Sequence, residues 1–228
     1  MSDPDLRIAI VAEGPTDQVV IEAALKAILN RPFIPTPLQP ESTRPDMGGG
    51  WGGVLKWCLE FRRSFGSVAR DPLLDQFDMV IIHVDADVAG KSYADYGPNL
   101  ELLAVKEALP PLPCQQPCPP PAASVMALRT VLMGWLGMAN LDGKMVFCIP
   151  SKATEAWLAS AVRPAVTPEM ECDLSLETKL KMLPKALRIR KSVPEYQKHA
   201  AAIRSGWNHV VARCTQAEQF QQDVRSVV

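Results

Sequence analysis

The sequence is poor in histidine and has no pair of cysteines in the CxxC spacing. Three His and six Cys are scattered over 228 residues, which leaves too few suitably spaced ligands for a zinc site. We therefore expect reduced thiols that serve as small apolar side chains. A redox or metal role for the pair Cys114 and Cys118 is the alternative.

The sequence also lacks a charge excess and a long apolar run. The formal charge is −1, so the totals do not describe a polycation that binds nucleic acid by charge alone. The longest apolar stretch after residue 120 is far shorter than a membrane span. Asp3 and Asp5 stand where a secretory leader would need positive charge. We expect a cytoplasmic protein with no membrane segment.

Short apolar segments alternate with helical patterns. We predict buried strands at 6–13, 78–87 and 144–150, since each is rich in apolar residues and adjoins turn or helix-capping residues. Helical periodicity is found at 19–29, 54–65, 125–139 and 151–162, and we expect a loop and a further helix over 93–110. Strands that are apolar on both faces are typical of parallel sheets covered by helices. The predicted fold class is α/β, with a Rossmann-like, mostly parallel sheet flanked by helices.

Two regions depart from this alternation. A proline-rich passage covers 32–45, and seven of the twelve residues at 110–121 are proline, which predicts an exposed insertion. Beyond 165 the pattern is helical and polar, and residues 151–228 hold 12 basic and 8 acidic residues. We predict an α/β domain over 1–163 and a helical, basic C-terminal extension over 164–228.

Acidic residues gather where the predicted strands end. Glu13 closes the first strand, Asp85 and Asp87 close the second, and Glu155 follows the third. Ligands of parallel sheets bind at this edge, and alternate residues of a strand share a face, so we expect the carboxylates to converge on a cation. Oxygen ligands favour Mg²⁺ or Mn²⁺, which would support phosphoryl transfer or phosphodiester hydrolysis. His83 has the same parity, and we expect it to be buried and bonded to backbone, with a role in the site as the alternative.

The sequences EGPTD (13–17) and VDAD (84–87), each at the end of an apolar strand, resemble the two motifs of TOPRIM domains. SKATEAWL (151–158) is similar to a segment of small bacterial TOPRIM-like proteins near the OLD and RloB groups, which are often associated with defence against phage. The resemblance covers roughly residues 6–160. Because the chain has neither a primase zinc module nor a topoisomerase tyrosine domain, a nuclease is the expected member.

The resemblance implies a metal-dependent nuclease that cleaves DNA or RNA with Mg²⁺ or Mn²⁺. Glu13 would be a general acid/base or a metal ligand, and Asp85 and Asp87 would hold the metal. Asp17 and Glu155 would support a second ion. The alternatives are a helix N-cap for Asp17 and a solvated first-turn acid for Glu155.

Basic side chains are expected to hold the phosphate. Lys152, just after the third strand, would stabilise the transition state. Residues 179–191 carry six basic residues and no acid, so we expect contacts with the nucleic-acid backbone there, although a solvated face is the usual explanation. The contacts assigned are Lys185, Arg188, Arg190 and Lys191.

The second hypothesis is a catalytically weak module that binds nucleic acid or nucleotide. It would act through a separately encoded ATPase, since no ATPase motif is found here: GKS at 90–92 would need glycine at 85, where Asp85 stands. A third possibility is a structural subunit whose acids only cap turns. The substrate, the number of ions and the oligomeric state stay open.

Overall fold

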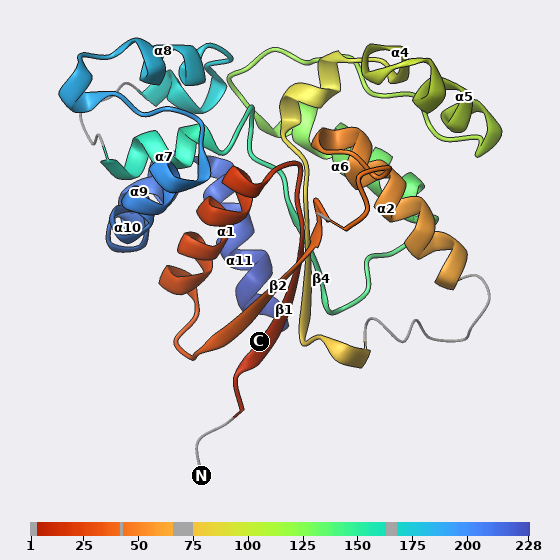
Figure 1. Ribbon diagram of the computed structural model, residues 1–228, viewed down its shortest axis with the longest axis horizontal. Coiled ribbons are helices and arrows are strands. Elements are labelled where there is room, and N and C mark those ends of the chain that lie inside the picture. Colours follow the sequence, from red (N-terminus) through yellow and green to blue (C-terminus); the bar gives the residue numbers. More distant parts are fainter. Residues whose placement is uncertain (1–3, 42, 66–74, 163–167) are drawn as a thin grey trace.

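Four parallel strands form the centre of the molecule, in the order β2-β1-β3-β4 (Figure 1). The computed structural model describes residues 4–41, 43–65, 75–162 and 168–228. The strands are β1 (Leu6–Val11), β2 (Phe33–Gln39), β3 (Met79–His83) and β4 (Met145–Cys148). Every strand pairing in the described residues is parallel. The predicted fold class, an α/β sheet flanked by helices, is confirmed.

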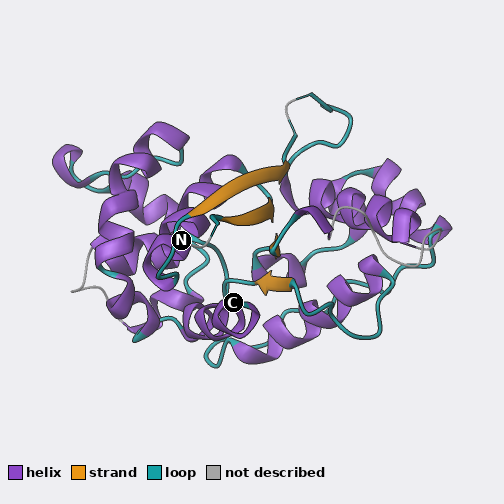
Figure 2. Cartoon of the chain, turned by 90° about the horizontal axis from the view of Figure 1, so that it is seen from below, coloured by secondary structure: helices purple, strands orange, loops and turns teal. Residues whose placement is uncertain are grey.

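Helices cover both faces of this sheet, as Figure 2 shows from below. One face is covered by α1 (Pro15–Ile28), α7 (Glu155–Val162), α9 (Val193–Ser205), α10 (Trp207–Val211) and α11 (Thr215–Val227). The other is covered by α2 (Gly50–Phe65) and α6 (Ala122–Leu136). Near the carboxyl edge lie α4 (Tyr93–Tyr96), α5 (Pro98–Lys106) and α8 (Leu176–Met182), and short 3₁₀ turns occupy Ala86–Gly90, Pro168–Cys172 and Lys185–Leu187.

Two hydrophobic cores result from the alternation of side chains along β1. Ile8 and Ile10 pack in the core with α1, and Ala9 and Val11 pack in the core with α2. The helices after residue 192 contribute Tyr196 and other buried side chains to the first core. The C-terminal segment therefore shares a core with the sheet, and the boundary predicted at 163 lies outside the described residues.

The strand β2 was not predicted. Its sequence, FIPTPLQ, contains Pro35 and Pro37, which lack the backbone N–H that a central strand needs. β2 is an edge strand and pairs only with β1, so each proline can direct its missing donor away from the sheet. A strand with two prolines in seven residues cannot be recognised from composition alone.

Two segments begin or end elsewhere than predicted. β3 ends at His83, and a 3₁₀ turn over Ala86–Gly90 follows, whereas the sequence predicts a strand to 87. The helix predicted from 151 begins at Glu155. Both differences lie at the carboxyl edge of the sheet, where the polar residues turn the chain.

The expectation of six reduced thiols is wrong for one pair. Cys118 of the proline-rich segment and Cys172 form a disulfide, with their Cα atoms 5.5 Å apart. Among the free cysteines, Cys114 is exposed and Cys58, Cys148 and Cys214 are buried. The spacing of 54 residues gives no local signal for this pair. No helix in the described ranges is long and apolar enough to cross a membrane.

Candidate metal site at the carboxyl edge of the sheet

Two chain reversals bring the polar residues of the site together. After β1, Gly14 is the N-cap residue of α1 and Pro15 is its first residue, a position that proline favours. This start buries Asp17 in the first turn of the helix. The end of the fully buried strand β3 places His83 and Asp85 beside it.

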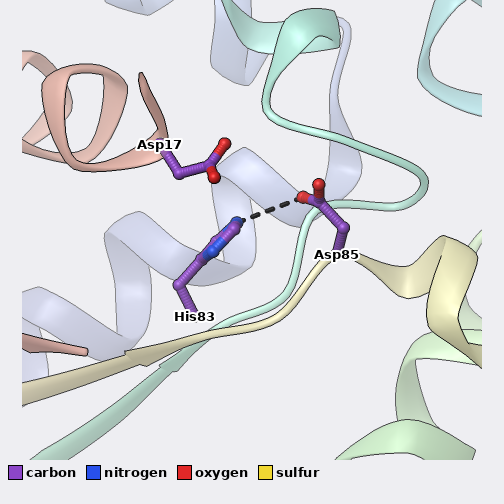
Figure 3. A group of neighbouring side chains, drawn as sticks. All are labelled: Asp17, His83 and Asp85. Atoms are coloured by element: carbon purple, nitrogen blue, oxygen red, sulfur yellow. Dashed lines mark hydrogen bonds and ion pairs between the residues drawn. The ribbon is translucent and has the colours of Figure 1, made fainter. Parts of the chain in front are cut away.

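Asp17, His83 and Asp85 form a close group. Each offers one ligand atom, and these atoms lie within 4.8 Å of one another (Figure 3). His83 Nε2 lies 3.1 Å from Asp85 Oδ1, and the three residues are 3%, 0% and 8% exposed. The hydroxyl of Thr154 donates to Asp17 Oδ1 at 2.6 Å. This arrangement of two carboxylates and one imidazole can hold a metal ion.

Glu13 and Asp87 lie beside this group. Glu13 Oε1 accepts a hydrogen bond from the backbone N–H of Asp85 at 2.8 Å, so it fixes the turn that carries Asp85. Asp87 lies in the 3₁₀ turn and pairs with Lys91 at 3.0 Å. Strand parity does not bring Asp85 and Asp87 together, because the strand has already ended, but both line the same cavity.

Glu155 connects the site to the C-terminal helices. Its carboxylate is only 1% exposed; Oε1 accepts a hydrogen bond from the Tyr196 hydroxyl at 2.7 Å and pairs with Lys191 Nζ at 3.0 Å. Lys191 also lies 3.4 Å from Glu177 of α8. Glu155 is thus buried and paired, rather than the solvated acid of the alternative.

Lys152 is buried against the site. It is 3% exposed, and its ammonium has no hydrogen-bond partner among the described residues. It lines a cavity of about 120 Å³ together with Asp85, Asp87 and Lys191. Burial lowers the pKa of Lys152, and Asp87 opposes that shift. An unpaired buried ammonium is costly, so an anionic group next to Lys152 would offset that cost, while the carboxylates that line the rest of the cavity favour cations.

An open groove of about 410 Å³ reaches the other side of the group. Glu13, Asp17 and Asp85 line it, as does Lys191. Asp85 and Lys191 line both this groove and the cavity. The close group is therefore accessible to an extended ligand that passes over Asp85.

The electrostatics of the site favour a cation or a proton. Burial, then the charge of Asp85, raises the pKa of Glu13 to about 8. Burial, then the charges of Asp17, Glu155 and Asp87, raises the pKa of Asp85 well above its usual range. In the part of the chain that is described, no Lys or Arg forms an ion pair with Glu13, Asp17 or Asp85.

The four expected nucleic-acid contacts fall into two kinds. Lys185 and Arg190 are exposed. Arg188 donates to the carbonyl of Leu183 at 3.2 Å, and Lys191 is bound to Glu155. Two of the four therefore have a structural role.

Three residues of the site were missed or misassigned. His83 bonds to a carboxylate rather than to backbone as expected, although its parity with Asp85 signals a shared face. Thr154 and Tyr196 were not predicted, because their partners Asp17 and Glu155 are far away in the sequence.

Comparison with protein-family models, curated proteins and solved structures finds no match for this chain.

Proposed function

We propose that the protein is a divalent-metal-dependent nuclease that hydrolyses phosphodiesters of DNA or RNA. The observation that carries this proposal is the buried group of Asp17, His83 and Asp85, at the edge where parallel sheets bind their ligands. The motif resemblance to TOPRIM-like nucleases points to the same chemistry, with a role in phage defence.

The side chains around the group suit hydrolysis. Asp17, His83 and Asp85 would hold the ion, which supplies an activated water and neutralises developing charge. Glu13 lies beside the group and accepts a hydrogen bond from the backbone N–H of Asp85, and it would exchange a proton with the attacking water as a general acid/base. Lys152 would stabilise the negative charge of the phosphate from the cavity wall.

The substrate would extend from the site toward the basic segment. Lys185 and Arg190 are exposed there, and phosphate contacts of this kind bind DNA and RNA alike. Mg²⁺ or Mn²⁺ is the expected cofactor. Asp87 and Glu155 line the adjacent cavity and would support a second ion.

A binding module that acts through a separate ATPase is the second candidate. Lys91 and Lys191 already pair with Asp87 and Glu155, which reduces the charge left for a second ion. Such a module would bind nucleic acid or nucleotide without turnover.

Cleavage of a substrate panel tests the proposal. The panel contains supercoiled plasmid, single-stranded DNA and total transfer RNA, each with Mg²⁺, Mn²⁺ or chelator. We expect cleavage that disappears with chelator and in Asp85→Asn, and that persists in Asp46→Asn, a change at an exposed position. Absence of cleavage by folded protein with either ion would overturn the nuclease and favour the binding module.

A further inference from the structure

The close group of Asp17, His83 and Asp85 offers one ring nitrogen beside two carboxylates. The nitrogen affects which metal ion the group prefers. We propose that the site takes a first-row transition cation, such as Mn²⁺, in preference to Mg²⁺, with His83 as a direct ligand. The inference rests on the metal site of the proposed function, but it concerns ion binding and not cleavage.

The spacing of the ligand atoms suits one ion. Two neighbouring ligands of an octahedral ion, each about 2.1 Å from it, lie about 3.0 Å apart. His83 Nε2 and Asp85 Oδ1 are 3.1 Å apart, and the Asp17 oxygen lies within 4.8 Å of both. The three side chains converge from α1 and the end of β3 (Figure 3).

The donor set discriminates between cations. Mg²⁺ prefers oxygen ligands and loses its water reluctantly. Imidazole suits Fe, Ni, Cu and Zn best, and Mn²⁺, the first member of that series, accepts one imidazole among oxygen ligands more readily than Mg²⁺ does. His83 is 0% exposed, so the ring cannot turn out to solvent to make room for a fully hydrated ion. A cation that binds nitrogen well can replace the hydrogen bond between His83 and Asp85, and Mg²⁺ replaces it poorly.

The hydrogen bonding of the imidazole ring links it to the site. His83 Nδ1 is buried and has no hydrogen-bond partner among the described residues. Among the described residues, the one hydrogen bond of this ring joins Nε2 to a carboxylate of the close group, so the ring faces the site.

Calorimetric titration of the chelator-treated full chain with Mn²⁺ and, separately, Mg²⁺ tests the preference. We expect Mn²⁺ to bind at least about tenfold more tightly than Mg²⁺. In His83→Gln, which offers an amide oxygen in place of the ring nitrogen, the ratio of the two dissociation constants should fall to within about threefold. Equal affinities in the wild type, or an unchanged ratio in His83→Gln, would overturn the inference.

Pulsed electron paramagnetic resonance of the Mn²⁺-loaded wild type gives a test that needs no variant. Coordination by His83 should produce a coupling between the ion and an imidazole ¹⁴N, and bound Mn²⁺ without that coupling would overturn the inference. Neither experiment contains nucleic acid. Tight Mn²⁺ binding without cleavage of any substrate would therefore defeat the proposed function alone, and cleavage with no preference for Mn²⁺ would defeat this inference alone.

Discussion

At the residue scale, Asp85 shows how the site is balanced. Its backbone N–H donates to Glu13, and its Oδ1 lies 3.1 Å from His83 Nε2. Burial and the charges of Asp17, Glu155 and Asp87 raise its pKa. The negative charges of these carboxylates repel one another unless a cation or a proton is bound. This repulsion leads to two measurable predictions.

Replacing Asp85 with Asn should stabilise the ion-free protein. The amide keeps the size of the side chain and removes one repelled charge, so the free energy of unfolding at alkaline pH should rise by about 1–3 kcal/mol. Urea denaturation with chelator present measures it. Asp46→Asn is the control and should change the value by less than about 0.5 kcal/mol. A loss of stability in Asp85→Asn under these conditions would contradict mutual repulsion at the site.

Replacing Glu13 with Gln should flatten the pH dependence of stability. The pKa of Glu13 rises from 4.5 to about 8 on folding, so between these values the folded protein holds a proton that the unfolded chain has lost. The free energy of unfolding of the ion-free wild type therefore falls as pH rises through this window. Denaturation of both proteins across that range compares the slopes, and identical slopes would count against a buried, protonated Glu13.

At the element scale, the C-terminal segment is held to the sheet through polar contacts at the site. Tyr196 of α9 and Lys191, just before α9, both reach Glu155 at the start of α7. Burial and the Glu155 charge raise the pKa of Tyr196, which keeps its hydroxyl protonated as a donor. The site and the packing of α9 are thus coupled.

Lys191→Met should destabilise the fold by about 2–4 kcal/mol, because Glu155 would keep its buried charge without a cation. The double variant Lys191→Met/Glu155→Gln should recover most of that loss. Thermal and urea unfolding measure both. Lys198→Met removes an exposed ion pair with Glu195 and should cost less than about 0.5 kcal/mol. Equal effects of Lys191→Met and Lys198→Met would show that the buried pair has no special role.

Gly53, near the start of α2, packs closely against Gln39 at the end of β2. A Cβ on Gly53 would collide with the side chain of Gln39 and with the carbonyl oxygen of Gly48, 2.6 Å away. Gly53→Ala should therefore lower the free energy of unfolding by about 1–3 kcal/mol, although alanine is the better helix former. At Gly143 no atom lies within 4 Å of an added Cβ, so Gly143→Ala should be nearly neutral. A stabilised Gly53→Ala protein would contradict this packing.

At the scale of the whole molecule, the sequence predicted what depends on local pattern. The apolar runs of β1, β3 and β4 gave three of the four strands and the edge at which Glu13, Asp85 and Glu155 lie. The edge strand β2 was missed because its prolines break the pattern. Asp17 and Asp85 were predicted as metal ligands, but a role of His83 in the site was only the alternative. The close group depends on where β3 stops and on the approach of α1, which local pattern does not encode.

The disulfide is the clearest long-range feature, and thiol counting tests it. In protein denatured without reductant, four cysteines should react with a thiol reagent, and all six after reduction. Reduction should lower the free energy of unfolding by about 2–4 kcal/mol, because a loop of 54 residues is no longer closed in the unfolded chain. Six reactive thiols before reduction would refute the Cys118–Cys172 pair.

The most direct test of the central claim is an anomalous difference map from crystals of the full chain that contain Mn²⁺. The account predicts a peak about 2.0–2.4 Å from a carboxylate oxygen of Asp17, a ring nitrogen of His83 and a carboxylate oxygen of Asp85. A map with no peak among these three side chains, at a concentration that saturates binding in solution, would contradict it.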